Sequence, residues 1–341
     1  MTDNATPERP NIRHVASVAG VSHMTVSRVL NNHPNIKADT RAKVLAVIEE
    51  LNYRPNSAAR ALATQRNRRI GVLIEASTAY GPSSTLRGIE RAAGQLDYSV
   101  TSVSVHSDEQ SDPREAVAQL TGQGVDALCV IAPRSSSLSA LRQLNIGLPA
   151  LVIKADADTS FLTTSLDQQQ GTFLVVDHLV ELGHRDVLHL SGPLDWLDAR
   201  ARERAFHTRS RDWKLRERPV VVGDWSPDFA YDYAISLKRR PDYTAIFAGN
   251  DEMALGLIHG FATRGIGIPD ELSIVGFDDL QLSAHFLPPL TTIRQDFHAL
   301  GSKAVSVLIA ALEGREVPKR TKLAAELQVR QSSGPPRKGS P

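Results

Sequence analysis

Cysteine is nearly absent from the chain, because Cys129 is the only one among 341 residues. A single cysteine excludes an internal disulfide. Long hydrophobic runs are also missing, since no stretch approaches the roughly 20 apolar residues that a membrane helix needs. The first ten residues, MTDNATPERP, contain no apolar segment of the kind that directs secretion. We therefore expect a cytoplasmic, nucleoid-associated protein without a membrane partner.

Recognisable catalytic and metal-binding motifs are lacking as well. The 11 histidines are scattered, without the spacing of HExxH or of paired Cys and His ligands. The sequence has no P-loop, no GxSxG nucleophile elbow and no GxGxxG dinucleotide fingerprint. Acidic residues near Asp278 could serve a glycosidase, but acids that recognise sugars look the same in sequence. We predict that the chain is not an enzyme and uses neither a cofactor nor a metal.

Apolar residues are plentiful enough for large cores, and charge is unevenly distributed. Hydrophobic residues make up 41% of a chain that is more than twice the usual domain length, so we expect at least two folding units. Residues 1–69 carry eleven Lys and Arg against five Asp and Glu, a net charge of +6, whereas the whole chain is at +1. A basic head on an acidic body predicts contact with a polyanion, with nucleic acid as the first candidate. Chance clustering of charge is the alternative.

The basic head contains the pattern of three short helices. Apolar residues recur at helical spacing from 12 to 19, and Gly20 then breaks the pattern. Ser22 is a suitable N-cap for a second helix at 23–30, and a third helix is predicted at 37–51. This order is typical of a helix-turn-helix, whose second helix enters the major groove of DNA. Spacing alone also permits a plain three-helix structural module.

The residue types in this head identify its function more specifically than their spacing does. They include VASVAGVS at 15–22, TVSRVLN at 25–31 and LNYRPN at 51–56, and they resemble the DNA-binding headpiece of the LacI/GalR family of transcriptional repressors. The resemblance implies that His23 and Met24 read operator bases, with Arg28 as the next reader. Met24 offers only apolar contact, whereas Arg28 can hold guanine with two hydrogen bonds. The residues predicted to contact DNA here are Ser22, His23, Met24, Thr25, Ser27, Arg28, Asn31 and Tyr53.

A short helix is predicted after the headpiece. Pro55 blocks helix continuation through residue 54, and residues 56–63 could then form about two turns. The resemblance implies that this is the family's hinge helix, which orders when two protomers meet on operator DNA. Its leucine, here Leu62, would enter the minor groove and bend the duplex, and Asn56 and Ala59 are predicted contacts on the same helix. An alanine-rich linker is the alternative.

From residue 69 onward, short apolar runs alternate with amphipathic segments. This rhythm predicts α/β architecture with doubly wound parallel sheets in two lobes. Ligands in such folds bind outside the carboxyl ends of the strands, where Trp225, Asn250 and Asp278 follow predicted strands. The predicted strands are 70–74, 98–105, 127–131, 187–190, 220–222, 245–247 and 272–277, and the predicted helices are 82–96, 113–120, 171–182, 198–210, 228–238 and 252–264.

Motifs in this body extend the family resemblance over nearly the whole chain. They are GPL at 192–194, ARAR at 199–202, GDWS at 223–226, ND at 250–251, MALG at 253–256, PPLTTI at 288–293 and QDF at 295–297. The resemblance implies a body like that of periplasmic sugar-binding proteins, in which two lobes close on a ligand. It also implies three roles in the cleft: Arg202, Asn250 and Asp278 bind sugar hydroxyls, Trp225 and Phe297 pack against the apolar face of the sugar, and Gln295 contributes a polar contact.

One wall of the predicted cleft departs from the family pattern. Ile131 and Lys154 stand where a well-known member has Asn and Asp, and Glu75 and Asp198 stand where it has serines. An ammonium in place of an acceptor inverts the local electrostatics, so the ligand should differ on that side, or Lys154 pairs with Glu75. We predict a sugar or glycoside effector; a galactoside is possible, and a purine or another small metabolite is the alternative. The predicted effector-binding residues are Glu75, Ile131, Lys154, Asp198, Arg202, Trp225, Asn250, Asp278, Gln295 and Phe297.

Simpler roles stay open for several of these residues. Arg202 could form a surface ion pair with Glu203, Asn250 and Asp251 could cap a helix, and Trp225 could belong to the core. A transport-type binding protein is a third functional class, which the attached headpiece opposes.

We predict four regions and a regulatory function. The regions are a helix-turn-helix headpiece at 1–53, a hinge helix and linker at 54–68, a two-lobed effector-binding and dimerisation domain at 69–331, and a disordered tail at 332–341. The tail, SSGPPRKGSP, has no leucine heptad, so we expect a homodimer on an inverted-repeat operator. The predicted function is repression that a sugar relieves, with corepression as the alternative.

Overall fold

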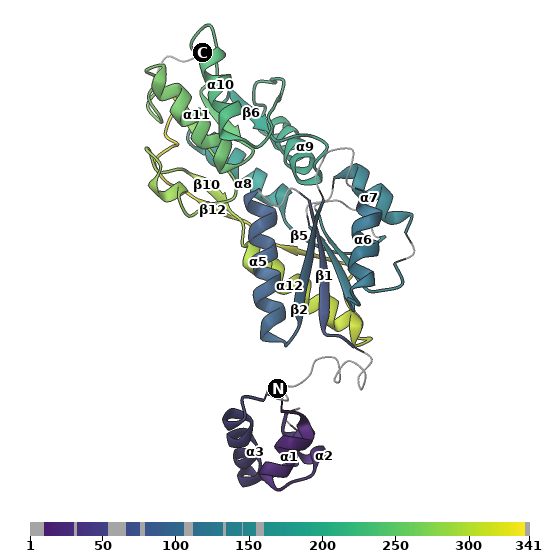
Figure 1. Cartoon of the computed structure of the whole chain (residues 1–341). Coiled ribbons are helices and arrows are strands. Elements are labelled where there is room, and N and C mark those ends of the chain that lie inside the picture. Colours follow the sequence, from purple (N-terminus) through teal and green to yellow (C-terminus); the bar gives the residue numbers. More distant parts are fainter. Residues whose placement is uncertain are drawn as a thin grey trace, which may run out of the picture. The chain divides into compact units, whose positions relative to one another are not determined.

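The chain divides into two compact units, Met1–Asn67 and Arg68–Pro341. The computed structural model (Figure 1) describes residues 10–30, 33–53, 66–75, 79–105, 112–131, 134–144, 146–154 and 160–337. Four predicted DNA contacts, Asn31, Asn56, Ala59 and Leu62, lie outside these residues, as does the predicted hinge helix. Among the described helices, none is long and apolar enough to cross a membrane.

The first unit is a three-helix bundle with a small core, as predicted. Its helices are α1 (Ile12–Ala19), α2 (His23–Leu30) and α3 (Ala38–Glu50). Gly20 ends α1 at a φ of 64°, in the left-handed region that glycine adopts without strain. The Ser22 hydroxyl caps α2 by accepting the Thr25 N–H at 3.1 Å. The buried side chains that join the helices are Val15, Ala16, Ala19, Val26, Val29, Val44, Val47 and Tyr53.

The second unit begins with a lobe built on a six-stranded parallel sheet. Its strand order is β11-β5-β4-β3-β1-β2. Helices α5 and α12 contribute to the core on one face of the sheet, and α6 and α7 contribute to a second core. The strands are β1 (Arg69–Glu75), β2 (Ser99–Val105), β3 (Ala127–Ile131), β4 (Ala150–Ile153), β5 (Leu162–Leu166) and β11 (Arg320–Leu323), and the helices are α5 (Tyr80–Gln95), α6 (Pro113–Gly122), α7 (Ser135–Arg142) and α12 (Phe297–Leu312).

The other lobe of this unit has a four-stranded parallel sheet in the order β7-β6-β8-β9. Helices α10 and α11 pack in one core, and α8 and α9 pack in another. The doubly wound α/β architecture predicted from the alternating pattern is therefore confirmed. The strands are β6 (Val187–Ser191), β7 (Val221–Val222), β8 (Ala245–Ala248) and β9 (Ser273–Val275), the helices are α8 (Gln168–Glu181), α9 (Leu197–Asp212), α10 (Pro227–Ser236) and α11 (Asp251–Thr263), and a 3-10 turn covers Ser283–His285.

The chain crosses between the two lobes three times. It passes from β5 to α8, from β10 (Thr292–Arg294) to α12, and from β11 to β12 (Glu326–Gln328), which pairs with β10 in an antiparallel ladder. Sequence analysis assigned no helix at 297–312 and no strand at 320–323, although both belong to the first lobe. Helix α12 packs so closely on α5 that a Cβ added at Gly301 would lie 2.5 Å from the backbone carbon of Gly88.

The C-terminal tail is ordered through residue 337, so the prediction of disorder is wrong for residues 332–337; residues 338–341 lie outside the described chain. Ser332 is fully buried beside strand β9. Its carbonyl accepts the Ile274 N–H at 2.8 Å, and its hydroxyl donates to the Ile274 carbonyl at 2.6 Å. The Gly334 carbonyl lies 2.9 Å from Nε2 of His184. Composition did not reveal this tail because its partners lie far away in the sequence.

We expect a chain that ends at Gln331 to unfold at a lower temperature than a chain that ends at Arg337. The shorter chain leaves the buried N–H groups of Ile274 and Thr291 without the acceptors that Ser332 provides. The expected loss is about 3 kcal/mol of unfolding free energy, which corresponds to a midpoint about 8 °C lower. Calorimetry of both chains measures the difference, and equal midpoints would contradict a stabilising role for the tail.

Candidate functional site

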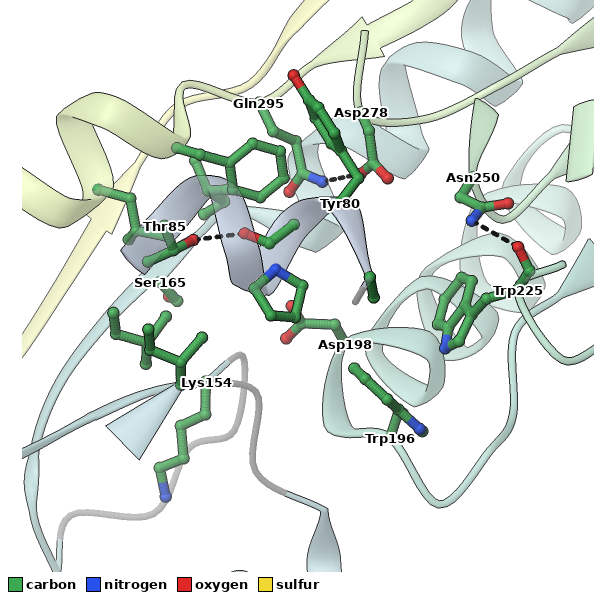
Figure 2. Close-up of a pocket in the computed structure, with 18 of the residues that line it drawn as sticks. Tyr80, Thr85, Lys154, Ser165, Trp196, Asp198, Trp225, Asn250, Asp278 and Gln295 are labelled. Carbon is green, nitrogen blue, oxygen red and sulfur yellow. Dashed lines mark hydrogen bonds between the residues drawn. The ribbon is translucent and has the colours of Figure 1, made fainter. Parts of the chain in front are cut away.

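A cavity in the second unit is lined by residues of both lobes. Three of its polar residues, Lys154, Asn250 and Asp278, follow the carboxyl ends of parallel strands, as expected for doubly wound folds. Nine of the ten predicted effector residues line it: Ile131, Lys154, Asp198, Arg202, Trp225, Asn250, Asp278, Gln295 and Phe297. Figure 2 shows the side chains around this cavity.

Arg202 lies at the centre of the polar wall. Its side chain is buried, which excludes the alternative of a surface ion pair with Glu203. Its Nε donates to the Gln168 side-chain oxygen at 2.7 Å, and Nη1 donates to the Gly249 carbonyl. Nη2 lies 3.8 Å from Oδ1 of Asp278. Burial lowers the pKa of Arg202, and the carboxylate of Asp278 opposes that shift.

Asp278 is held next to this guanidinium in an unusual backbone conformation. Its φ is 117°, a value that a residue with a side chain rarely adopts and that costs conformational energy. Gln295 donates its side-chain N–H to the Asp278 carboxylate. Burial raises the pKa of Asp278 to about 7, although the charge of Arg202 pulls it down. A strained, buried acid beside a buried base is typical of a functional site rather than of a structural ion pair.

Gln168 connects the polar residues and was missed by sequence analysis. It is buried at the start of α8, where the chain enters the second lobe. Its Nε2 lies 3.0 Å from Oε1 of Gln295 and 3.3 Å from Oδ2 of Asp198, while its Oε1 accepts from Arg202. No local signal marks it, because it is one of three consecutive glutamines and only the fold brings its partners together.

Trp225 forms an aromatic wall of the cavity and is not an ordinary core residue. Its φ is 75°, and a Cβ added at Gly192 would lie 2.2 Å from its indole ring, so glycine is required beneath it. Trp196 meets it edge to face, with the ring centroids 6.0 Å apart. Within the described chain, the buried indole N–H of Trp225 has no hydrogen-bond partner. Sequence analysis missed Trp196 and Tyr80, which also line the cavity; an aromatic residue near a predicted strand end was the available signal.

Asn250 caps a helix and also lines the cavity, so its predicted contact with the effector stays a prediction. Its side-chain oxygen caps α11 by accepting the Met253 N–H at 2.9 Å, and its Nδ2 donates to the Trp225 carbonyl at 3.1 Å. The same residue lines the cavity. Asp251 has a structural role instead, because its buried carboxylate accepts from the backbone of Leu280 and from the hydroxyls of Ser283 and Thr292.

The first lobe presents a largely apolar wall to the cavity, formed by Pro82, Ile131, Ile153, Leu166, Phe297 and Leu300. The ammonium of Lys154 points away from Asp198, Asp278 and Gln295 (Figure 2). Glu75 is the predicted site residue that the structure does not place in the cavity lining. Its buried carboxylate accepts the Arg134 N–H at 2.7 Å instead, and burial raises its pKa. Within the described chain, the hydrogen bond of the Glu75 carboxylate is therefore with Arg134 and not with Lys154.

The first unit presents the predicted reading residues on one exposed helix. His23, Met24 and Arg28 are exposed on α2, whereas Val26 and Val29 of the same helix are buried. Met24 is 55% exposed, which is unusual for so apolar a side chain. Tyr53 is only 8% exposed and packs in the core of this unit, and its predicted contact with DNA stays a prediction. The structure does not place it among the exposed residues of α2.

Comparisons with known proteins agree with this architecture in both units. Residues 11–56 match the family described as "Bacterial regulatory proteins, lacI family", and residues 176–333 match "Periplasmic binding protein-like domain". The lactose operon repressor of Escherichia coli (strain K12) is 34% identical over 324 residues, which cover 94% of this chain and 89% of that protein. Catabolite control protein A of Priestia megaterium is 31% identical over an alignment that covers 94% of this chain and 98% of that protein.

Solved structures agree over the same extent. A crystal structure of the lac repressor dimer bound to operator and the anti-inducer ONPF superimposes with a TM-score of 0.82 at 32% identity, covering 96% of this chain and all of that one. The match includes both the headpiece and the two-lobed unit that holds the cavity. The chain belongs to the lacI family of bacterial regulatory proteins.

Proposed function

We propose that this repressor binds an inverted-repeat operator as a homodimer and is released when a small sugar or glycoside enters the cavity between its lobes. The observation that carries the proposal is the pairing of Arg202 with Asp278 beside Trp225, inside a cavity lined by both lobes. The exposed reading helix α2 supports the DNA-binding half of the function. The relatives are repressors, which supports a regulatory function over an enzymatic one.

The chemistry of the cavity favours a sugar. A guanidinium and a carboxylate can bracket neighbouring hydroxyls with charge-assisted hydrogen bonds, and an indole suits the C–H face of a pyranose ring. Arg202 and Asp278 provide the first arrangement and Trp225 the second. Among the described residues, the first-lobe wall around Ile131 is mainly apolar, with Ile153, Leu166 and Leu300 beside it, so we expect an apolar part of the ligand to face it.

Effector and DNA binding are coupled in this proposal through the movement of one lobe relative to the other. If a sugar lowers operator affinity by some factor, the operator must lower sugar affinity by the same factor. In corepression the coupling has the opposite sign, so that the effector raises operator affinity instead of lowering it. The dimer's two-fold symmetry should be mirrored in the operator.

Selection of bound duplexes from a random pool, repeated with a panel of sugars, nucleobases and other metabolites, tests the proposal. We expect an inverted repeat to be enriched and a sugar to release it. If a nucleobase releases the DNA and no sugar does, the effector is a nucleobase instead of a sugar. If a sugar tightens binding to the operator, the protein acts by corepression. Failure to bind any duplex at low salt would overturn the function. Hydrolysis of chromogenic glycosides would identify an enzyme instead.

We expect sugar affinity to fall about tenfold between pH 8 and pH 6. The pKa of Asp278 is about 7, so the carboxylate is ionised above this pH and protonated below it. Only the ionised form accepts charge-assisted hydrogen bonds from sugar hydroxyls, and binding therefore releases a proton. Calorimetry of the releasing sugar at both pH values measures the change. The comparison variant is Glu252→Gln, which removes the other cavity carboxyl with a raised pKa. Affinity should still fall toward low pH in this variant, with the midpoint moved to lower pH, because the Glu252 charge helps to raise the pKa of Asp278.

A further inference from the structure

Two short segments join the lobes at a place distinct from the three chain crossovers. One is the start of α7 in the first lobe, and the other is the loop that enters α9 in the second. Arg134 and Trp196 form an isolated antiparallel bridge, and the Ser135 N–H donates to the Asp195 carbonyl at 3.3 Å. Figure 1 shows α7 and α9 facing each other at this side of the molecule.

Charged side chains reinforce this backbone contact. Nε of Arg134 lies 3.4 Å from Oδ2 of Asp195, with the two side chains 28% and 52% exposed. From the second lobe, Arg200 donates to the hydroxyl of Ser135. The guanidinium of Arg134 also lies 5.6 Å from the centre of the Trp196 ring, within the range of a cation–π contact.

Glu75 and Trp196 connect these contacts to the rest of the molecule. Glu75 is buried at the end of β1 and holds the backbone N–H of Arg134, which fixes the segment before α7 to the first lobe's sheet. Trp196 lines the effector cavity and meets Trp225 edge to face (Figure 2). A ligand in the cavity would therefore touch a residue that also bridges the lobes.

We propose that these residues form an interlobe clasp that positions one lobe on the other: Arg134, Ser135, Asp195, Trp196 and Arg200. Partly exposed ion pairs are individually weak, so the clasp can open when a ligand favours another lobe orientation. The clasp rests on the proposed function at one point only, the identification of that ligand as the effector. Glu75, the predicted site residue outside the cavity, is then a positioning residue that acts through Arg134.

Pulsed electron paramagnetic resonance on the full chain tests the clasp by measuring the distance between the two lobes. Spin labels at Gln119→Cys and Asp232→Cys, which are exposed positions on α6 and α10, report the distance between the lobes. The native Cys129 is buried and should not be labelled. Three clasp variants are compared with the labelled parent chain: Arg134→Glu, Asp195→Arg, and the charge-swapped chain with both substitutions.

We expect each single reversal to broaden the distance distribution and shift it, because two like charges then face each other, and we expect the charge swap to restore the parent distribution. The matched control reverses the exposed pair of Glu313 and Arg315 at the end of α12 and should leave the distribution unchanged. Circular dichroism confirms folding. Identical distributions in all clasp variants, or no restoration in the swap, would overturn the clasp. Failure of every sugar to release DNA would overturn the proposed function but not this result.

Discussion

Replacing Asp278 with asparagine should leave a repressor that binds its operator but no longer responds to sugar. We expect effector affinity to fall at least about 100-fold, because the sugar hydroxyls lose a charge-assisted acceptor inside a buried cavity. Asparagine has the same shape and can still accept the hydrogen bond from Gln295. Calorimetry with the releasing sugar and a DNA-binding titration, each on the parent and the variant, measure the two effects separately.

The variant should also fold normally. Burial raises the pKa of Asp278 to about 7, above the value of an exposed aspartate, so ionising it at higher pH costs folding free energy that asparagine avoids. The matched control is the neighbouring Asp279→Asn. Asp279 pairs with Arg294 at 2.7 Å and Arg330 at 2.6 Å, so its replacement should lower thermal stability but keep sugar affinity. Sugar affinity within threefold of the parent in Asp278→Asn would contradict the proposed site.

Replacing Arg28 with alanine should abolish sequence discrimination. Arg28 is exposed on α2, where it can hold guanine through two hydrogen bonds, an interaction worth about 1–3 kcal/mol per half-site. Because a dimer uses two half-sites, we expect operator affinity to fall about 100-fold, with a much smaller change on unrelated DNA. Titrations of operator and scrambled duplexes at the same salt concentration measure the ratio.

Lys43→Ala is the charge-matched control for this experiment. Lys43 is exposed on α3, so its removal takes away one positive charge without changing the reading helix. The substitution should weaken binding to the operator and to scrambled DNA to a similar extent, since attraction to phosphate does not depend on the base sequence. An unchanged preference for the operator in Arg28→Ala would show that another residue reads the bases.

Several features of the site could be anticipated because the signals for them are local. A polar or aromatic residue directly after an apolar strand reaches the carboxyl edge of a sheet, and Trp225, Asn250 and Asp278 were found in this way. Glu75 is the last residue of strand β1, yet its carboxylate turns to the Arg134 backbone. Which way a side chain turns at a strand end depends on the segment packed beside it, and no pattern within β1 reports that segment.

The resemblance to the LacI/GalR family implied six of the cavity residues: Ile131, Lys154, Asp198, Arg202, Gln295 and Phe297. The amino-acid sequence by itself determined the three headpiece helices, the Ser22 cap, the alternation of strands and helices, and the strand-end residues Trp225, Asn250 and Asp278. Each follows from hydrophobic period and backbone preference over a few neighbouring residues. Only the tertiary structure decided the return of α12 and β11 to the first lobe, the seating of Ser332 on β9, and the central position of Gln168. These features depend on hydrogen bonds and packing between residues far apart in the chain, which local patterns do not encode.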